Sequence, residues 1–123
     1  MKTKFDAKSA HELRYLDLGG RGVRDLLAVD GGFLVLAGPS GEGGYSFAIY
    51  FWDGHDGLKG AEPQGSCRLL AELPSSDKVK PEGLTLVSED ATAYEILVVN
   101  DGAKSPSLDA YKLRKPSLPR AAR

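Results

Sequence analysis

Hydrophobic residues along this chain fall into short runs that are separated by glycine-containing turns. Residues 22 to 38, GVRDLLAVDGGFLVLAG, predict two strands joined by a tight turn at residues 30 to 32, Asp-Gly-Gly. The second strand, residues 33 to 37, contains no polar side chain. A strand of that kind is expected to be covered on both faces.

Two further strands are predicted between residues 45 and 73. Residues 45 to 52, YSFAIYFW, form the most aromatic run and favour a strand, and this run is better explained by core packing than by a platform for sugars or bases. Residues 67 to 73, CRLLAEL, predict a fourth strand. Its charged residues, Arg68 and Glu72, indicate an outer and half-exposed position.

The second half of the chain repeats this plan. Residues 80 to 102, KPEGLTLVSEDATAYEILVVNDG, predict a second pair of strands, and residues 108 to 113 predict a third. When the two halves are aligned, Leu84 corresponds to Leu26 and Tyr111 corresponds to Tyr50. A repeat of about 55–60 residues with four strands per unit is typical of the blades of a β-propeller.

Residues 12 to 18, ELRYLDL, are compatible with two structures. Ser9 and Glu12 have the spacing of a helix capping box, and Gly19 could end a short helix. Alternation at Leu16 and Leu18 favours a strand instead, which is our preferred interpretation. That strand would be the outer strand of the last blade or of a neighbouring protomer.

The predicted fold is therefore all-β, with two four-stranded antiparallel propeller-like blades. Propellers close with roughly 4–8 blades, so two blades leave exposed edges and an apolar face. Either the chain is a fragment of a longer propeller, or copies associate head to tail until a ring closes. Three copies would complete six blades, so we expect self-association.

Composition places few limits on function. The chain has 123 residues, 41% of them hydrophobic and 27% charged, with a net charge of −1. We expect a polar arm over residues 1–10, one domain over residues 11–113 and a basic, proline-containing tail over residues 114–123. The balanced charge argues against a nucleic-acid partner.

The cysteine and histidine content excludes the commonest structural sites. Cys67 is the single cysteine, so no internal disulfide can form, and two histidines are too few for a usual zinc site. The start of the chain lacks a secretory signal, and no apolar run approaches the ~20 residues that span a bilayer. These features predict a soluble, cytoplasmic protein without a membrane partner.

The ordered motifs resemble a bacterial protein family of unknown function that is expected to form a β-propeller. The segments that carry the resemblance are LDLGGRGVRDL at 16–26, FLVLAGP at 33–39, YFWDG at 50–54, LLAELP at 69–74, KPEGL at 80–84 and LVVNDG at 97–102. The family has no established reaction. The resemblance therefore implies an architecture and no particular chemistry.

A binding site is expected where the innermost strand of each predicted blade begins, at the mouth of a propeller channel. This location places Arg24 and Asp25 beside Glu82, and a small-molecule ligand could bind there. The structural alternative is that Arg24 pairs with Asp25 or Glu82 and locks one blade to the next. On this basis we expect a non-catalytic binding or scaffold module.

A hard-cation site is the second hypothesis. Glu82, Asn100 and Asp101 offer oxygen ligands of the kind that Ca²⁺ takes, and calcium-dependent lactonase-like and phytase-like propellers are similar in fold. A calcium-dependent hydrolase is thus the alternative function. The structural alternative for Asn100 and Asp101 is a turn that their side chains stabilise.

Three other features are interpreted as structural. The loop GPSGEGG at residues 38–44 lacks the Gly-Lys-Ser/Thr ending of a phosphate-binding loop. Cys67 is expected to be a small buried hydrophobe, and His55 a turn residue rather than a cation ligand.

Overall fold

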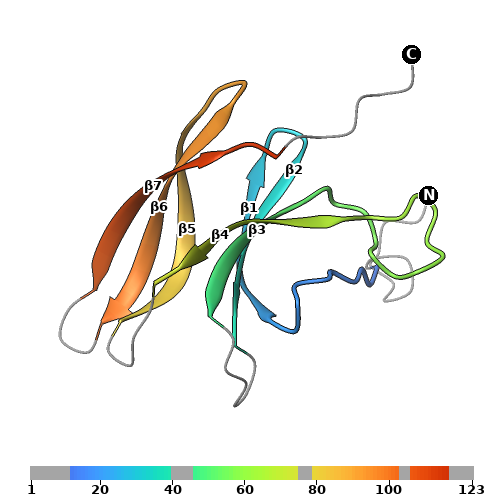
Figure 1. Ribbon diagram of the computed structural model, residues 1–123, viewed down its shortest axis with the longest axis horizontal. Coiled ribbons are helices and arrows are strands. Elements are labelled where there is room, and N and C mark those ends of the chain that lie inside the picture. Colours follow the sequence, from blue (N-terminus) through green and yellow to red (C-terminus); the bar gives the residue numbers. More distant parts are fainter. Residues whose placement is uncertain (1–11, 40–45, 75–78, 103–105, 117–123) are drawn as a thin grey trace, which may run out of the picture.

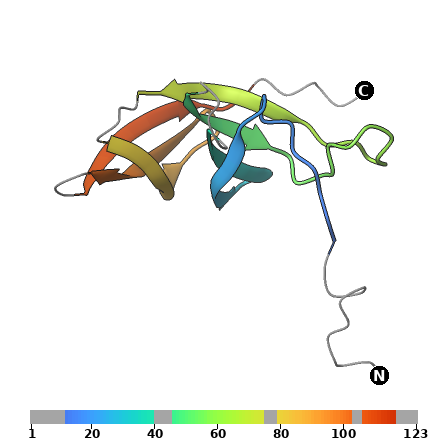
Figure 2. The same ribbon diagram turned by 90° about the horizontal axis from the view of Figure 1, so that it is seen from below.

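Two antiparallel β-sheets make up the protein. The computed structural model describes residues 12–39, 46–74, 79–102 and 106–116. Within these ranges the first sheet has four strands in the order β1-β2-β3-β4, the second has three in the order β5-β6-β7, and no helix is present (Figure 1). Figure 2 shows the two sheets as adjacent, twisted layers. The all-β prediction is confirmed.

The first sheet is a simple meander. Its strands are β1 (Gly22–Val29), β2 (Gly32–Gly38), β3 (Phe47–Trp52) and β4 (Cys67–Leu73), as the sequence predicts to within two residues. The β1–β2 turn falls at Asp30-Gly31, and Gly31 has φ of 82°, a conformation that L side chains rarely adopt. The central strands β2 and β3 are covered on both faces, as their unbroken apolar sequences predict.

The second sheet consists of β5 (Val79–Glu89), β6 (Ala93–Gly102) and β7 (Ser107–Arg114). The prediction of a second four-stranded blade is wrong for the described residues. Residues 12–18, which were expected to supply the outer strand of the last blade or of a neighbouring protomer, are not a strand. Cys67–Leu73 is the outer strand of the first sheet, with Leu73 opposite Phe47. Because no described segment takes that place in the second sheet, one side of β7 is left unpaired.

The N-terminal segment also differs from the prediction. Residues 12 to 18 form neither a strand nor a helix. Tyr15 is fixed to the loop after β3, since its N–H donates to Asp56 Oδ1 at 2.9 Å and its carbonyl accepts from Gly57 N at 2.6 Å. Leu18 packs on the outer face of the first sheet, where its carbonyl accepts a hydrogen bond from the Tyr50 hydroxyl at 3.1 Å.

The segment lies there because the outer face of the first sheet is apolar and needs cover. Val35, Ala37, Tyr50 and Trp52 face it, and Leu18 closes over them with 4% of its surface exposed. Serving as a strand elsewhere would uncover these side chains. The hydrophobic effect within one chain therefore explains why residues 12–18 cover this face and do not form a strand.

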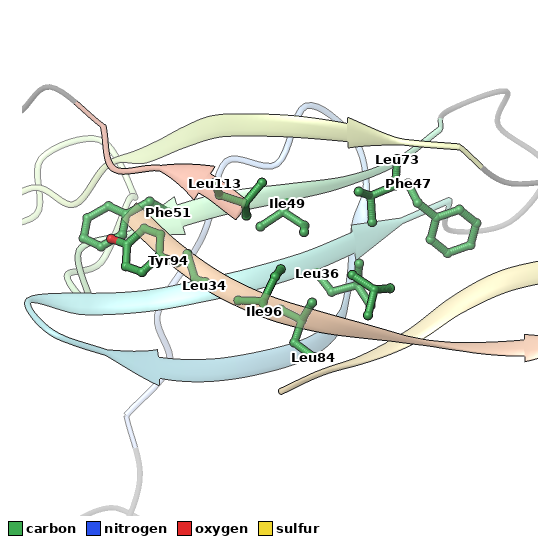
Figure 3. Close-up of a cluster of buried hydrophobic side chains, with 11 residues drawn as sticks. Leu34, Leu36, Phe47, Ile49, Phe51, Leu73, Leu84, Tyr94, Ile96 and Leu113 are labelled. Carbon is green, nitrogen blue, oxygen red and sulfur yellow. The ribbon is translucent and has the colours of Figure 1, made fainter. Parts of the chain in front are cut away.

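The main core lies between the sheets. Leu34, Leu36, Ile49 and Phe51 of the first sheet meet Ile96 and other apolar side chains of the second (Figure 3). The complete buried set is Leu34, Leu36, Phe47, Ile49, Phe51, Leu73, Leu84, Tyr94, Ile96, Val98 and Leu113. The two sheets are thus one hydrophobic unit, held at its edges by the polar contacts described below.

Parts of three predictions fall outside the described residues. These are the polar arm at residues 1–10, most of the loop at residues 38–44 and residues 117–123 of the basic tail. Among the residues that are described, none belongs to a helix long and apolar enough to cross a membrane.

Candidate functional site

Arg24 and Glu82 meet at one end of the joint between the sheets. Each bulges from its strand, because the pairing register shifts between Val23 and Asp25 on β1 and between Pro81 and Gly83 on β5. A bulge redirects the side chain of the extra residue. Arg24 Nη2 consequently lies 2.7 Å from Glu82 Oε1, with about a third and two-fifths of the side chains exposed.

Asp25 joins the same two strands through the backbone. Its Oδ2 accepts a hydrogen bond of 2.7 Å from the N–H of Leu84, on the side of β5 that faces away from β6. The three predicted ligand-binding residues, Arg24, Asp25 and Glu82, are therefore brought together, and all three hold the sheets to each other. This arrangement matches the structural alternative derived from the sequence.

Asn100 is buried at the end of the inter-sheet core, with 2% of its surface exposed. Its Nδ2 donates to Asp109 Oδ2 at 2.8 Å and to Ser107 Oγ at 3.4 Å. These bonds connect β6 to β7. Asn100 is a strand residue, so the turn interpretation of Asn100 and Asp101 is wrong.

The predicted cation ligands do not share one face. Asn100 and Asp101 are consecutive residues of β6, so their side chains point to opposite faces, and Asp101 is exposed. Glu82 is already paired with Arg24. Across the described ranges no group of three or more His, Cys, Asp or Glu side chains is placed to hold a metal ion.

A cleft opens at the opposite end of the strands, between residues of the two sheets. It has a volume of about 570 Å³. Segments from both sheets line it: the β1–β2 turn, the end of β3, the start of β4, the β5–β6 turn, β6 and the residues after β7. The lining side chains that the argument uses are Asp30, Phe51, Asp53, Arg68, Tyr94 and Lys115.

Glu89 fixes the geometry of this cleft. Its Oε1 accepts a hydrogen bond from the Asp30 N–H at 3.2 Å, and its Oε2 lies 2.7 Å from Lys115 Nζ. Lys115 lowers the pKa of the Glu89 carboxyl, with a smaller contribution from the Asp30 N–H. One carboxylate therefore connects the β1–β2 turn, the end of β5 and the residue after β7.

Tyr94 and Phe51 lie side by side at the cleft end of the core (Figure 3). Burial, together with the nearby Glu89 and Asp30 carboxylates, raises the pKa of the Tyr94 hydroxyl to about 12. Lys115 Nζ lies 5.2 Å from the centre of the Tyr94 ring, a cation–π distance. The cleft thus combines an aromatic floor with charged walls.

The loop between β3 and β4 supports one wall. Asp53 Oδ2 accepts hydrogen bonds from Ser66 N and Oγ, and its Oδ1 accepts from His55 N. His55 is exposed and its carbonyl accepts from Trp52 Nε1 at 2.8 Å, so it is placed as a turn residue. Cys67 is half-buried on the outer face of the first sheet, where burial raises the pKa of its thiol to about 11.

Residues 2–112 match the protein family described as "Protein of unknown function (DUF3616)", which covers most of the chain. The chain belongs to this family. The resemblance to a family of unknown function is confirmed at that level. No curated protein and no solved structure matches the chain.

Sequence reasoning placed the candidate site around Arg24 and Glu82 and did not find the cleft, which lies at the other end of the strands. The signal was present in the repeated hairpins, since Asp30 and Asp90 end corresponding strands and Lys115 follows the last one. Acidic residues in turns are so common that this pattern did not indicate a pocket. Of the floor residues, Phe51 was interpreted only as part of a core strand, and Tyr94 was given no role of its own.

Proposed function

We propose that this protein is a non-catalytic binding module whose small-molecule ligand enters the cleft between the ends of the two sheets. The observation that carries the proposal is the cleft of about 570 Å³, lined by both sheets. Ligand pockets commonly have volumes of ≈ 300–1,000 Å³, with apolar walls and a few polar groups that orient the ligand. Phe51 and Tyr94 supply the apolar surface, and Arg68 and Asp30 supply polar groups.

The contacts of the lining residues support binding over catalysis. Asp53 is held by Ser66 and by the backbone of His55, and Lys115 is held by Glu89. Nucleophilic catalysis needs a nucleophile within reach of a base that activates it. Here Ser66 Oγ donates to a carboxylate that already has backbone donors, so this pair stabilises the loop.

Amide chemical-shift mapping with a small panel of aromatic compounds tests the proposal. The panel is phenol, benzoate and benzylamine, which share a ring and differ in charge. We expect at least one of them to shift the amide signals of Asp30, Arg68 and Tyr94. Shifts confined to residues around Arg24 and Glu82 would show that the ligand binds at the joint between the sheets and not in the cleft. The absence of shifts with all three compounds would contradict the proposed function.

A calcium-dependent hydrolase using Glu82, Asn100 and Asp101 is the alternative. It requires these side chains to rearrange around a cation, because Glu82 is paired with Arg24 and Asn100 with Asp109. Binding to the folded state raises the melting temperature by mass action. A rise in melting temperature with calcium that a chelator reverses would favour the hydrolase, and an unchanged melting temperature would exclude it.

A propeller-type assembly is part of the same proposal. Among the described strands, β7 is hydrogen-bonded on one side only, and its Leu108 is 60% exposed. An unpaired strand edge is a template for pairing with another chain. We propose that a second copy of the chain covers this edge, with three copies completing the ring. Light scattering should then give a mass of about three times 13.1 kDa, and a strictly monomeric particle would contradict it.

A further inference from the structure

Tyr94 brings an unpartnered polar group to the floor of the cleft. Only 1% of the residue is exposed, and it lines the cleft beside Phe51 (Figure 3). Across the described ranges its hydroxyl neither donates nor accepts a hydrogen bond, and the oxygen is accessible from the cleft. Nearly all buried polar groups have a partner, because burying one without it costs free energy. The hydroxyl is therefore a position where a bound ligand would complete a hydrogen bond.

Asp30 adds an unpartnered charge to the wall of the same cleft. Its backbone N–H donates to Glu89 Oε1 at 3.2 Å, but its carboxylate is in no hydrogen bond or ion pair with any residue that the structure describes. The carboxylate is close enough to Tyr94 to contribute to the raised pKa of the tyrosine hydroxyl. Two hydrogen-bonding groups without partners thus lie near each other in one cleft.

The other charged side chains of the cleft already have partners. Asp53 is held by hydrogen bonds from the loop that follows it. Lys115 is paired with Glu89 at 2.7 Å, and Arg68 has an interaction partner of its own. In the described part of the chain, the charge of the cleft lining that remains uncompensated is therefore the negative charge of Asp30.

The aromatic floor also suits a positive charge. The π-face of an aromatic ring attracts cations within about 6 Å of its centre. The protein itself places one there, since Lys115 Nζ lies 5.2 Å from the centre of the Tyr94 ring. Phe51 presents a second ring next to Tyr94 (Figure 3). A ligand that enters beside these rings gains from carrying a cation and an apolar part.

We propose that the ligand of the cleft carries an amino group, whose ammonium donates hydrogen bonds to the Asp30 carboxylate and the Tyr94 hydroxyl while its apolar part lies on Phe51. The inference rests on the proposed function and names the ligand class. An ammonium has three donors and no acceptor, so it matches one carboxylate and one hydroxyl oxygen. A carboxylate or phosphate in the same place would be repelled by Asp30.

Amide chemical-shift titrations with benzylamine, benzyl alcohol and benzoate test the inference. The three compounds share a ring and differ in the charge of the attached group. We expect benzylamine to bind at least about tenfold more tightly than benzyl alcohol, the factor that corresponds to one hydrogen bond to a charged group, and benzoate to bind most weakly. Sodium chloride should weaken the binding of benzylamine and leave that of benzyl alcohol nearly unchanged, because Asp30 is exposed.

Two variants remove the proposed contacts one at a time. Asp30→Asn removes the charge and keeps the backbone N–H that binds Glu89, and asparagine is as well suited as aspartate to a position before glycine in a tight turn. Tyr94→Phe removes the hydroxyl and keeps the ring. Both should lower the affinity for benzylamine towards that for benzyl alcohol. The control, Glu62→Gln, removes an exposed carboxylate that lines a separate hollow and should leave the affinity unchanged.

Urea unfolding distinguishes a binding role of the hydroxyl from a structural one. Since the hydroxyl has no hydrogen-bond partner among the described residues, Tyr94→Phe should leave the urea midpoint nearly unchanged while it weakens the binding of benzylamine. A lower midpoint with an unchanged affinity for benzylamine would show that the hydroxyl stabilises the fold, and would overturn its role as a ligand contact.

The failure of this inference differs from the failure of the proposed function. Equal affinities for the three compounds, with shifts at the cleft, would overturn the preference for an amine and leave the binding module supported. Tighter binding of benzoate than of benzylamine would do the same. An unchanged affinity for benzylamine in Asp30→Asn would overturn the contact with Asp30. The absence of binding by all three compounds would contradict both proposals.

Discussion

Arg24 and Glu82, each the bulged residue of its strand, lie 2.7 Å apart across the joint between β1 and β5. Next to them, Asp25 Oδ2 accepts the Leu84 N–H, also at 2.7 Å. A backbone donor at the edge of one sheet is thus satisfied by a carboxylate from the other. The apolar core brings the sheets together, and this pair of contacts fixes their relative position.

Asp25→Ala should destabilise the protein more than Arg24→Ala. Removing Asp25 leaves the partly buried Leu84 N–H without its partner, which costs about 1–3 kcal/mol. Removing Arg24 breaks a partly exposed ion pair, which costs about 0.2–1 kcal/mol. Urea unfolding measures both, and Asp25→Asn, which keeps an acceptor oxygen, is the matched control. A larger loss for Arg24→Ala would contradict the joint described here.

Leu18→Ala tests the position of the N-terminal segment. Leu18 has 4% of its surface exposed against the outer face of the first sheet, so truncation should cost about 2–5 kcal/mol. The control is Leu13→Ala, since Leu13 is 68% exposed and should change stability by no more than about 0.5 kcal/mol. Equal, small effects of the two substitutions in thermal or urea unfolding would show that the segment does not cover the sheet.

Stability should fall as the solution is acidified. Hydrogen bonds from the Tyr15 and Leu58 N–H groups lower the pKa of Asp56, and those from Thr92 and Ala93 lower that of Asp90. A carboxyl whose pKa is lower in the folded state stabilises the fold above its ordinary pKa, near 4, and this contribution is lost as the pH falls through its lowered pKa.

Urea midpoints between pH 7 and pH 3 measure this loss. Asp56→Asn should make the decrease in stability towards low pH shallower than in the unmodified protein. Asp101→Asn is the control, because Asp101 is an exposed acid at the other end of the molecule. An unchanged slope for Asp56→Asn would contradict the role of its hydrogen bonds to Tyr15 and Leu58.

The Cys67 thiol should react slowly in the folded protein. Burial, with smaller contributions from the carboxylates of Asp53 and Asp17, raises its pKa to about 11. Because the thiolate is the reacting form, labelling by Ellman's reagent at pH 8 should be roughly 100-fold slower than in urea-unfolded protein. The unfolded sample is the control. Equal rates in the two samples would contradict the burial of Cys67.

The sequence predicted the strands well, because each one is an apolar run between glycine-containing turns. Phe33 to Ala37 is the clearest case, since five consecutive apolar residues require cover on both sides and β2 has it. The segment over residues 12–18 was harder to predict. Alternation at Leu16 and Leu18 favours a strand, but the same alternation does not distinguish a strand that pairs in a sheet from a segment that covers the face of one.

The candidate site was predicted only in part. Arg24, Asp25 and Glu82 do come together, because corresponding ends of adjacent strands meet at one edge. Whether such a cluster binds a ligand or joins two sheets depends on distances that a sequence does not contain. The cleft depends on how the two sheets pack against each other near Tyr94, which no local sequence pattern determines.

β5 contributes a glutamate to each end of the inter-sheet joint, Glu82 to Arg24 and Glu89 to the N–H of Asp30. The number of residues between these two glutamates therefore determines the position of the second sheet along β1. Inserting or deleting one residue between them would turn one carboxylate to the opposite face, since side chains alternate along a strand. Only one of the two glutamates could then keep its contact with β1 or the β1–β2 turn, and the width of the cleft would change as a result.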